Sequence, residues 1–154
     1  RESDLEGLNS KSPMFFMVYV LARRNSAKDW RTGLAFSLES SGVKYQNEID
    51  HIFPQNVLNK FFEGKNMDSK KIKKLVNDLG NLAFLSKVSN IKKGKITPDV
   101  YFPRTIKEFG NEILTAQCIP TEASYWNLDN YDNFLKERRK SIADGINDLM
   151  QSLG

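Results

Sequence analysis

Glu48-Ile49-Asp50-His51-Ile52-Phe53-Pro54-Gln55 is the segment around which the fold of this 154-residue chain is organised. His51 is the only histidine in the sequence, and it directly follows an acid. Proline cannot donate to a strand ladder, so Pro54 ends the strand that the sequence predicts over residues 44–52. Neighbouring side chains of a strand point to opposite faces, so Asp50 and His51 converge only if the chain bends there, as the approach to Pro54 allows.

Two segments downstream complete a strand–strand–helix pattern. Ser69 can cap a helix over residues 70–79, and Gly80 can end it in the left-handed conformation. The apolar run that follows predicts a strand over residues 81–86 that is buried on both faces. Residues 87–92 then predict a helical turn that contains Asn90 and ends at Gly94.

Three motifs in this order resemble those of the HNH nucleases, also called ββα-metal or His-Me finger nucleases. The motifs are Asp-His-Ile-x-Pro from Asp50, Asn-Leu-x-x-Leu from Asn81, and Asn-x-x-Lys-Gly-Lys from Asn90. More closely, the chain resembles the C-terminal nuclease domain of GmrSD-type, modification-dependent restriction enzymes, over about residues 44–103. In the wider group one strand carries the Asp-His pair, the second carries the middle Asn, and the helix carries a last His or Asn.

The residue types suit phosphodiester hydrolysis, which needs an activated water, a cation and a positioned backbone. An imidazole has an ordinary pKa near 6.5, so His51 is the expected general base. Asp50 and Asn90 offer the hard oxygens that Mg²⁺ prefers, with Mn²⁺ as a substitute. Asn81 matches the middle Asn, and the resemblance implies that its amide holds the loop that carries His51.

The chain departs from the family pattern in two places. Thirty positions separate His51 from Asn81, which is longer than in compact HNH domains, so we expect an inserted helix that folds away from the site. The last position is Asn90 and not a histidine, which favours Mg²⁺ or Mn²⁺ over a softer metal. Glu48 shares a strand face with Asp50 and is either a supporting acid or a solvated one.

Each motif also has a simpler interpretation. Asp50-His51 can be a hydrogen-bonded pair at the end of a strand, and the asparagines can be turn formers. Taken singly, the residues favour that interpretation. Taken together, in the expected order and between strand and helix patterns, they favour a nuclease site.

Positive charge is concentrated next to this site. Residues 59–95 contain ten lysines and three acids, within a chain of net charge +4. A basic block of this kind suits contact with a polyphosphate backbone, although a run of lysines on a helix is also often a solvated face. The predicted nucleic-acid contacts are Lys70, Lys71, Lys73, Lys74, Lys92, Lys93 and Lys95.

Composition limits the class of protein. Hydrophobic residues at 40% and charged residues at 27% are typical of one globular domain. Cys118 is the only cysteine, which excludes an internal disulfide and suits a reducing cytoplasm. The longest apolar run, residues 14–22, is shorter than the roughly 20 residues that span a membrane. The chain begins at Arg1 without a methionine, so we expect an N-terminal domain of the same protein.

Helices are predicted on both sides of the strand–strand–helix unit. They span residues 13–24 after Ser12-Pro13, a segment from Ser26 or Asp29 to Phe36, then 55–62, a helix from Pro98, 104–115, and about 130–152. The expected fold is α+β and predominantly helical. It comprises a helical part (12–40), the ββα-metal core (about 44–103) with its two-stranded antiparallel sheet, and C-terminal helices (104–153).

The sequence therefore predicts a metal-dependent DNA endonuclease domain of HNH type, the effector of a restriction-modification or phage-defence enzyme. One alternative is a non-catalytic nucleic-acid-binding module that keeps the fold, which metal-dependent cleavage would distinguish from a nuclease. Another is a structural tether for the N-terminal domain, which would show neither cleavage nor salt-dependent DNA binding.

Overall fold

The predicted strand–strand–helix unit lies at the centre of the molecule. The computed structural model describes residues 1–36 and 47–154. Strand β1 (Asn47–His51) pairs antiparallel with β2 (Leu82–Ser86), in a register that sets Asp50 opposite Ala83, and helix α4 (Lys87–Lys93) follows directly. Every residue of β2 is buried, and α4 ends at Gly94 with a positive φ of 51°, as expected. Residues 44–46 of the expected first strand lie outside the described residues.

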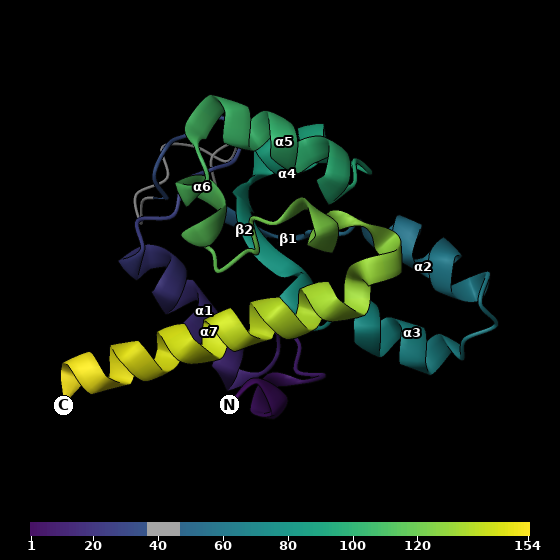
Figure 1. Ribbon diagram of the computed structural model, residues 1–154, viewed down its shortest axis with the longest axis horizontal. Coiled ribbons are helices and arrows are strands. Elements are labelled where there is room, and N and C mark those ends of the chain that lie inside the picture. Colours follow the sequence, from purple (N-terminus) through teal and green to yellow (C-terminus); the bar gives the residue numbers. More distant parts are fainter. Residues whose placement is uncertain (37–46) are drawn as a thin grey trace.

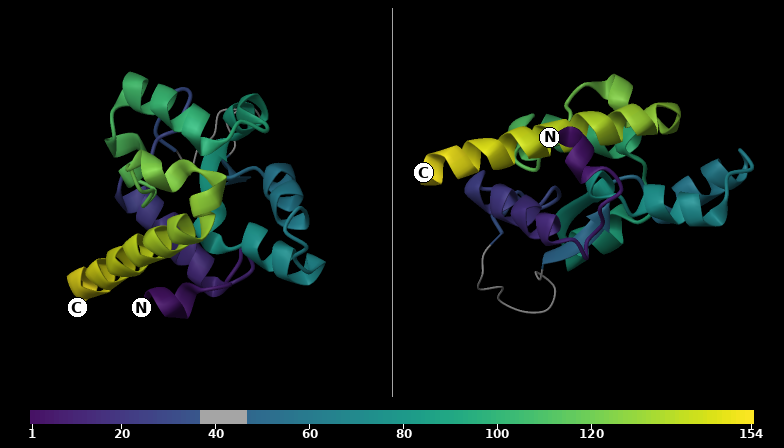
Figure 2. Two further views of the ribbon diagram at one scale, coloured as in Figure 1. Left: turned by 45° about the vertical axis from the view of Figure 1, so that its right-hand side comes forward. Right: turned by 90° about the horizontal axis from the view of Figure 1, so that it is seen from below.

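Helices surround this small sheet, so the expected α+β, mostly helical fold is confirmed (Figure 1). Helix α7 runs along one side of the molecule, and the α2–α3 pair projects at the end opposite the C-terminus, as both views of Figure 2 also show. The α-helices of the described residues, besides α4, are α1 (Pro13–Arg24), α2 (Gln55–Glu63), α3 (Ser69–Val76), α5 (Pro98–Phe109), α6 (Glu112–Thr115) and α7 (Tyr131–Leu153). Short 3₁₀ turns lie at η1 (Glu2–Leu5), η3 (Leu79–Asn81), η4 (Ala123–Trp126) and η5 (Leu128–Asn130).

Strand β2 separates two hydrophobic clusters. Ala83 and Leu85 face the first cluster, which contains Phe53 with its ring centroid 5.0 Å from that of Phe134 on α7. Leu82 and Phe84 face the second cluster, which is formed mainly with α1 and the later part of α7. The alternation of side chains along a strand explains why a continuous apolar run serves both clusters.

A buried arginine joins α7 to the sheet. The guanidinium of Arg138 donates to four backbone carbonyls, those of Leu79, Gly80, Leu82 and Gln117. Burial lowers the pKa of Arg138 to about 10, because desolvation penalises the charged form. The carbonyls of Leu79, Gly80 and Leu82 are buried at the start of β2 and in the turn before it, so Arg138 supplies hydrogen bonds that they would otherwise lack. The same bonds hold this turn against the long helix α7.

The prediction of a helix from Ser26 or Asp29 to Phe36 is wrong. The segment is a reverse turn closed by a bridge between Lys28 and Ala35, with Gly33 at a φ of +66°. Trp30 is buried, whereas Leu34 is 60% exposed. Residues 37–40 of the expected helical part lie outside the described residues.

The side chain of Asp29 supplies the physical reason for that turn. Its carboxylate accepts from the backbone N–H of Ser86 at 2.8 Å, and from the hydroxyls of Ser89 and Thr32. Burial alone would raise the pKa of Asp29, but these hydrogen bonds outweigh burial and the pKa lies below its ordinary value. Tertiary hydrogen bonds to the β2–α4 junction therefore replace the local helix.

Helix ends also differ from the expectation in several places. Asp68 caps α3 in place of Ser69, accepting from Lys71 N at 3.1 Å, and α3 stops at Val76. Gly80 does not adopt the left-handed conformation; instead, a Cβ there would lie 3.1 Å from a methyl of Leu135, so glycine allows the close approach to α7.

The segment expected as one helix over 104–115 is divided between α5 and α6, because Gly110 adopts a φ of +83°. The expected starts at Pro13 and Pro98 are confirmed, with Ser12 accepting from Met14 N. On α7 the side chains of Tyr131, Phe134, Leu135, Ile142 and Ile146 are buried and Leu149 is partly buried, whereas Met150 is 58% exposed. No helix of the described residues is long and apolar enough to cross a membrane.

Replacing Arg138 by methionine should destabilise the fold, because it leaves buried carbonyls without a donor. We expect Arg138→Met to lower the free energy of unfolding by about 3 kcal/mol or more, measured by urea titration. Lys140→Met, at an exposed position of the same helix, should change it by less than about 0.5 kcal/mol. Equal losses in the two variants would contradict the assigned contribution of Arg138.

Candidate functional site

Asp50 and His51 line one hollow at the end of β1. The hollow has a volume of about 190 Å³ and is lined by Asp50, His51, Pro54, Gln55, Asn56, Gly94 and Lys95. Both residues therefore line one pocket, although they are neighbours on a strand. Lys95, one of the predicted phosphate contacts, lines this pocket.

Asn81 holds the loop that follows His51. Its side chain is fully buried, and its amide oxygen accepts from Phe53 N at 2.8 Å. Its amide nitrogen donates to the carbonyl of Phe53 at 3.1 Å and to that of Val76 at 3.0 Å. Asn81 thus acts on the backbone beside the histidine and not on the imidazole ring.

The ring of His51 contacts a different asparagine, which the sequence did not single out. Nε2 of His51 lies 2.9 Å from Oδ1 of Asn77, at the end of α3. The segment inserted between the strands therefore returns to the site at its last turn, which corrects the expectation that it folds away. The sequence predicted Asn77 only as a residue of the helix over 70–79, and nothing local indicated the contact with residue 51.

Lys93 is buried against the predicted metal ligand. Its ammonium nitrogen lies 2.9 Å from Oδ2 of Asp50 and donates to the carbonyl of His51 at 2.9 Å. Lys93 is 1% exposed and Asp50 is 6% exposed. Burial raises the pKa of Asp50 above its ordinary value, and the charge of Lys93 opposes that rise. Lys93 is therefore not placed for the phosphate contact that the sequence predicted, because its charge is directed inward.

Asn90 contacts the other acid on the same strand face. Its amide nitrogen donates to Oε2 of Glu48 at 3.1 Å. Glu48 precedes Asp50 by two positions, and Lys93 follows Asn90 by about one helical turn. Helix α4 thus lies along β1, with Asn90 beside Glu48 and Lys93 beside Asp50. This arrangement explains the position of Glu48, which is a paired acid and not a solvated one.

The donor chemistry at this face suits a hard cation. Glu48 and Asp50 supply carboxylates, Asn90 supplies an amide oxygen, and Oδ2 of Asp50 is buried without a hydrogen bond of good geometry from any described residue. Within residues 1–36 and 47–154, no cluster of three or more His, Cys, Asp or Glu side chains could hold a metal. The oxygens at this face are of the kind that a hard cation binds, and Lys93 is the competing charge at Asp50.

The four lysines of α3 line a groove on the adjacent surface. The groove has a volume of about 730 Å³, and α3 forms one wall while an N-terminal segment forms the other. Lys11 also lines the groove, a fifth lysine that the sequence did not single out. The lining residues are Gly7, Asn9, Ser10, Lys11, Asp68, Lys70, Lys71, Lys73, Lys74 and Asn77, so the residue that contacts His51 also borders the basic groove. Lys92, the remaining predicted contact, is exposed on α4.

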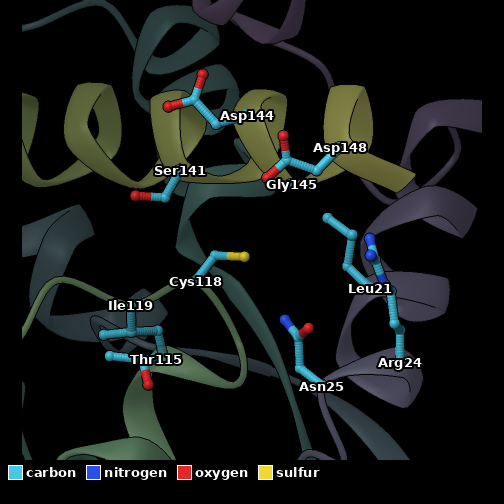
Figure 3. A pocket seen from close by; sticks show the side chains of 10 residues that line it. All are labelled: Leu21, Arg24, Asn25, Thr115, Cys118, Ile119, Ser141, Asp144, Gly145 and Asp148. Atoms are coloured by element: carbon cyan, nitrogen blue, oxygen red, sulfur yellow. The ribbon is translucent and has the colours of Figure 1, made fainter. Parts of the chain in front are cut away.

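Another hollow, of about 540 Å³, lies between α1, α7 and the segment after α6 (Figure 3). Its lining includes Arg24, Asp144, Asp148 and Cys118, whose thiol points into the hollow. None of the predicted site residues lines it. It is a separate feature of the helical layer.

The fold and the pocket define a mixed α+β domain in which an acid and an imidazole share one hollow at the exit of a strand, beside a basic groove. Over residues 4–143, the sequence matches the family described as "GmrSD restriction endonucleases, C-terminal domain", and the chain belongs to that family. This match confirms the resemblance to the C-terminal domain of GmrSD-type restriction enzymes. No curated protein and no solved structure matches the chain.

Removing the ammonium group of Lys93 should destabilise the fold, because it leaves the carboxylate of Asp50 buried without a counter-charge. We expect Lys93→Met to lower the free energy of unfolding by about 3–5 kcal/mol. Lys92→Met, at the exposed neighbouring position, is the matched control and should change it by less than about 0.5 kcal/mol. Adding Asp50→Asn to Lys93→Met should recover part of the loss; a double variant less stable than Lys93→Met would contradict a paired charge.

Proposed function

We propose that this domain is a metal-dependent DNA endonuclease of HNH type, the effector part of a restriction or phage-defence enzyme. The observation that supports the proposal most directly is the pocket shared by Asp50 and His51, in a chain that belongs to a family of restriction endonucleases. The fully buried Asn81 fixes the backbone beside it. A positioned base next to a carboxylate is what hydrolysis of a phosphodiester requires.

His51 is the proposed general base, which takes a proton from the attacking water. Its side chain is partly exposed at the pocket, so water has access to the ring. Asn81 would contribute by holding the loop that follows, since its amide satisfies both backbone groups of Phe53. A general base must keep a fixed position relative to the phosphate, and a held backbone helps to keep it there.

Asp50 and Asn90 are the proposed ligands of Mg²⁺, with Mn²⁺ as a substitute. When bound, the cation would supply positive charge against the phosphate. Lys93 would then share Asp50 with the cation, and Glu48 would release or share the amide of Asn90. The side chains thus offer oxygen ligands, but their present hydrogen bonds and ion pair must be rearranged.

Those contacts also favour the alternative function, a non-catalytic nucleic-acid-binding module. In such a module Lys93 would neutralise Asp50 permanently, and Asn90 would only tie α4 to Glu48. The basic groove would still bind a phosphate backbone. Cleavage that depends on a divalent cation distinguishes the two functions.

DNA contact is proposed for the exposed lysines Lys70, Lys71, Lys73 and Lys74 of the groove, and for Lys92 and Lys95 nearer the pocket. Contacts to phosphates position a duplex without identifying its sequence. Because the family is that of a C-terminal domain, we propose that an N-terminal domain of the same enzyme selects the modified target.

His51→Ala should abolish cleavage of supercoiled plasmid in Mg²⁺ or Mn²⁺, because it removes the base. Its folding and its affinity for DNA should stay close to those of the parent, since no lysine is changed. The parent should lose cleavage when EDTA is added. A His51→Ala variant that cuts at the parent rate would exclude His51 as the base, and a parent that binds DNA but never cuts would support the non-catalytic module.

Reversing the charge of Lys70, Lys71, Lys73 and Lys74 to glutamate should weaken binding to every duplex alike. For each phosphate that the variant no longer neutralises, the slope of log K against log salt should become less negative by about 0.9. The matched control reverses four exposed lysines outside the groove, Lys28, Lys107, Lys136 and Lys140, with the same change in net charge. Equally weakened binding in the two variants would show that net charge matters and that the groove does not.

A further inference from the structure

Asn77 makes two hydrogen bonds to the last turn of α3, next to its contact with His51. Its amide nitrogen donates to the carbonyl of Lys73 at 2.9 Å, within the last turn of α3. Its backbone N–H also donates to that carbonyl. The side chain of Asn77 therefore both ends the helix and reaches the imidazole.

This pattern fixes which way the amide of Asn77 faces. A backbone carbonyl can only accept a hydrogen bond, so the NH₂ group of Asn77 must face Lys73. The amide oxygen, which can also only accept, then faces Nε2 of His51 at 2.9 Å. Nε2 must carry the hydrogen, and in the neutral ring Nδ1 is left with the free lone pair.

We propose that Asn77 is a positioning residue that holds the imidazole of His51 as the Nε2–H tautomer and directs Nδ1 to the substrate. The first half of this proposal depends only on the contacts of Asn77. The second half, in which Nδ1 takes the proton from water, rests on the proposed nuclease function.

Asn77 differs from Asn81 in what it orients. Asn81 binds the backbone of Phe53, whereas Asn77 binds the ring of His51 itself. A base needs both restraints, because a fixed backbone leaves the imidazole free to rotate about its own side-chain bonds.

The residue that follows Asn77 keeps it in place. One carboxylate oxygen of Asp78 accepts from Gly80 N at 2.8 Å. The other accepts from Gly7 N and from Arg139, each at 2.9 Å. Asn77 is thus attached to α3 on one side and to a fixed turn on the other, so its amide has little freedom to leave the ring.

The test uses the fact that the chain has a single histidine. Protein labelled with ¹⁵N-histidine gives one pair of ring nitrogen signals, which report the tautomer without DNA or metal. At a pH where the ring is neutral, we expect the parent to show a protonated Nε2 and an unprotonated Nδ1. A protonated Nδ1, or an averaged mixture of the two tautomers, would overturn the proposal.

Two variants separate positioning from helix capping. Asn77→Ala removes the acceptor and should give a mixture of tautomers, whereas Asn77→Asp keeps an oxygen acceptor and should retain the Nε2–H form. Neither variant can donate to the Lys73 carbonyl from its side chain, so loss of the cap alone would leave the tautomer the same in both. Asn130→Ala, which removes another amide that donates to a carbonyl, is the matched control and should leave the ring signals as in the parent.

Cleavage by Asn77→Ala gives the second measurement. We expect its kcat to fall between those of the parent and His51→Ala, with KM little changed, because the ring is misoriented while the DNA contacts remain. An unchanged kcat would overturn the positioning of the base. A parent with the expected tautomer that does not cleave DNA would overturn only the proposed nuclease function.

Discussion

The buried carboxamide of Asn81 is the interaction on which the rest of the site depends. It satisfies both backbone groups of Phe53 and the carbonyl of Val76, three polar groups that no water reaches. Leaving such groups unpaired costs about 1–3 kcal/mol each, so the loop after β1 and the end of α3 are held together as one unit. Arg138 performs a similar task on the other side of the same turn. The position of His51 is therefore determined mainly by buried hydrogen bonds and only secondarily by the short sheet.

The charges at the site are held by a buried ion pair and not by backbone hydrogen bonds alone. The ion pair between Asp50 and Lys93 is buried, and a buried pair is retained only when each charge is compensated by the other. A buried carboxylate stays ionised only with some such counter-charge. Lys93 fills that need in the present structure, and its second bond, to the carbonyl of His51, ties the counter-charge to the strand that carries the site.

The sequence could predict those parts of the structure that depend on local pattern. Both strands and the helix after them follow from an apolar run, Pro54 and Gly94. The sequence could not predict the turn at Asp29, because that carboxylate finds its partners Ser86 and Ser89 nearly sixty positions away. For the same reason, the sequence did not predict the inward direction of Lys93 or the contact of Asn77 with His51. A lysine after an isoleucine-lysine pair, or an asparagine after a helix, has the same local pattern whether its partner is solvent or a residue far along the chain.

The contacts of Asn81 have a consequence for the length of the segment between the two strands. Phe53 lies at the entrance to that segment and Val76 at its exit, and one side chain binds both. The entropic cost of closing a flexible loop rises only with the logarithm of the loop length, by about 0.6 kcal/mol of free energy for each doubling. With its two ends fixed to the same amide, the α2–α3 segment can take added residues in the turn between its helices at little entropic cost, because the core side chains of α2 and α3 and the asparagine at the end of α3 stay where they are.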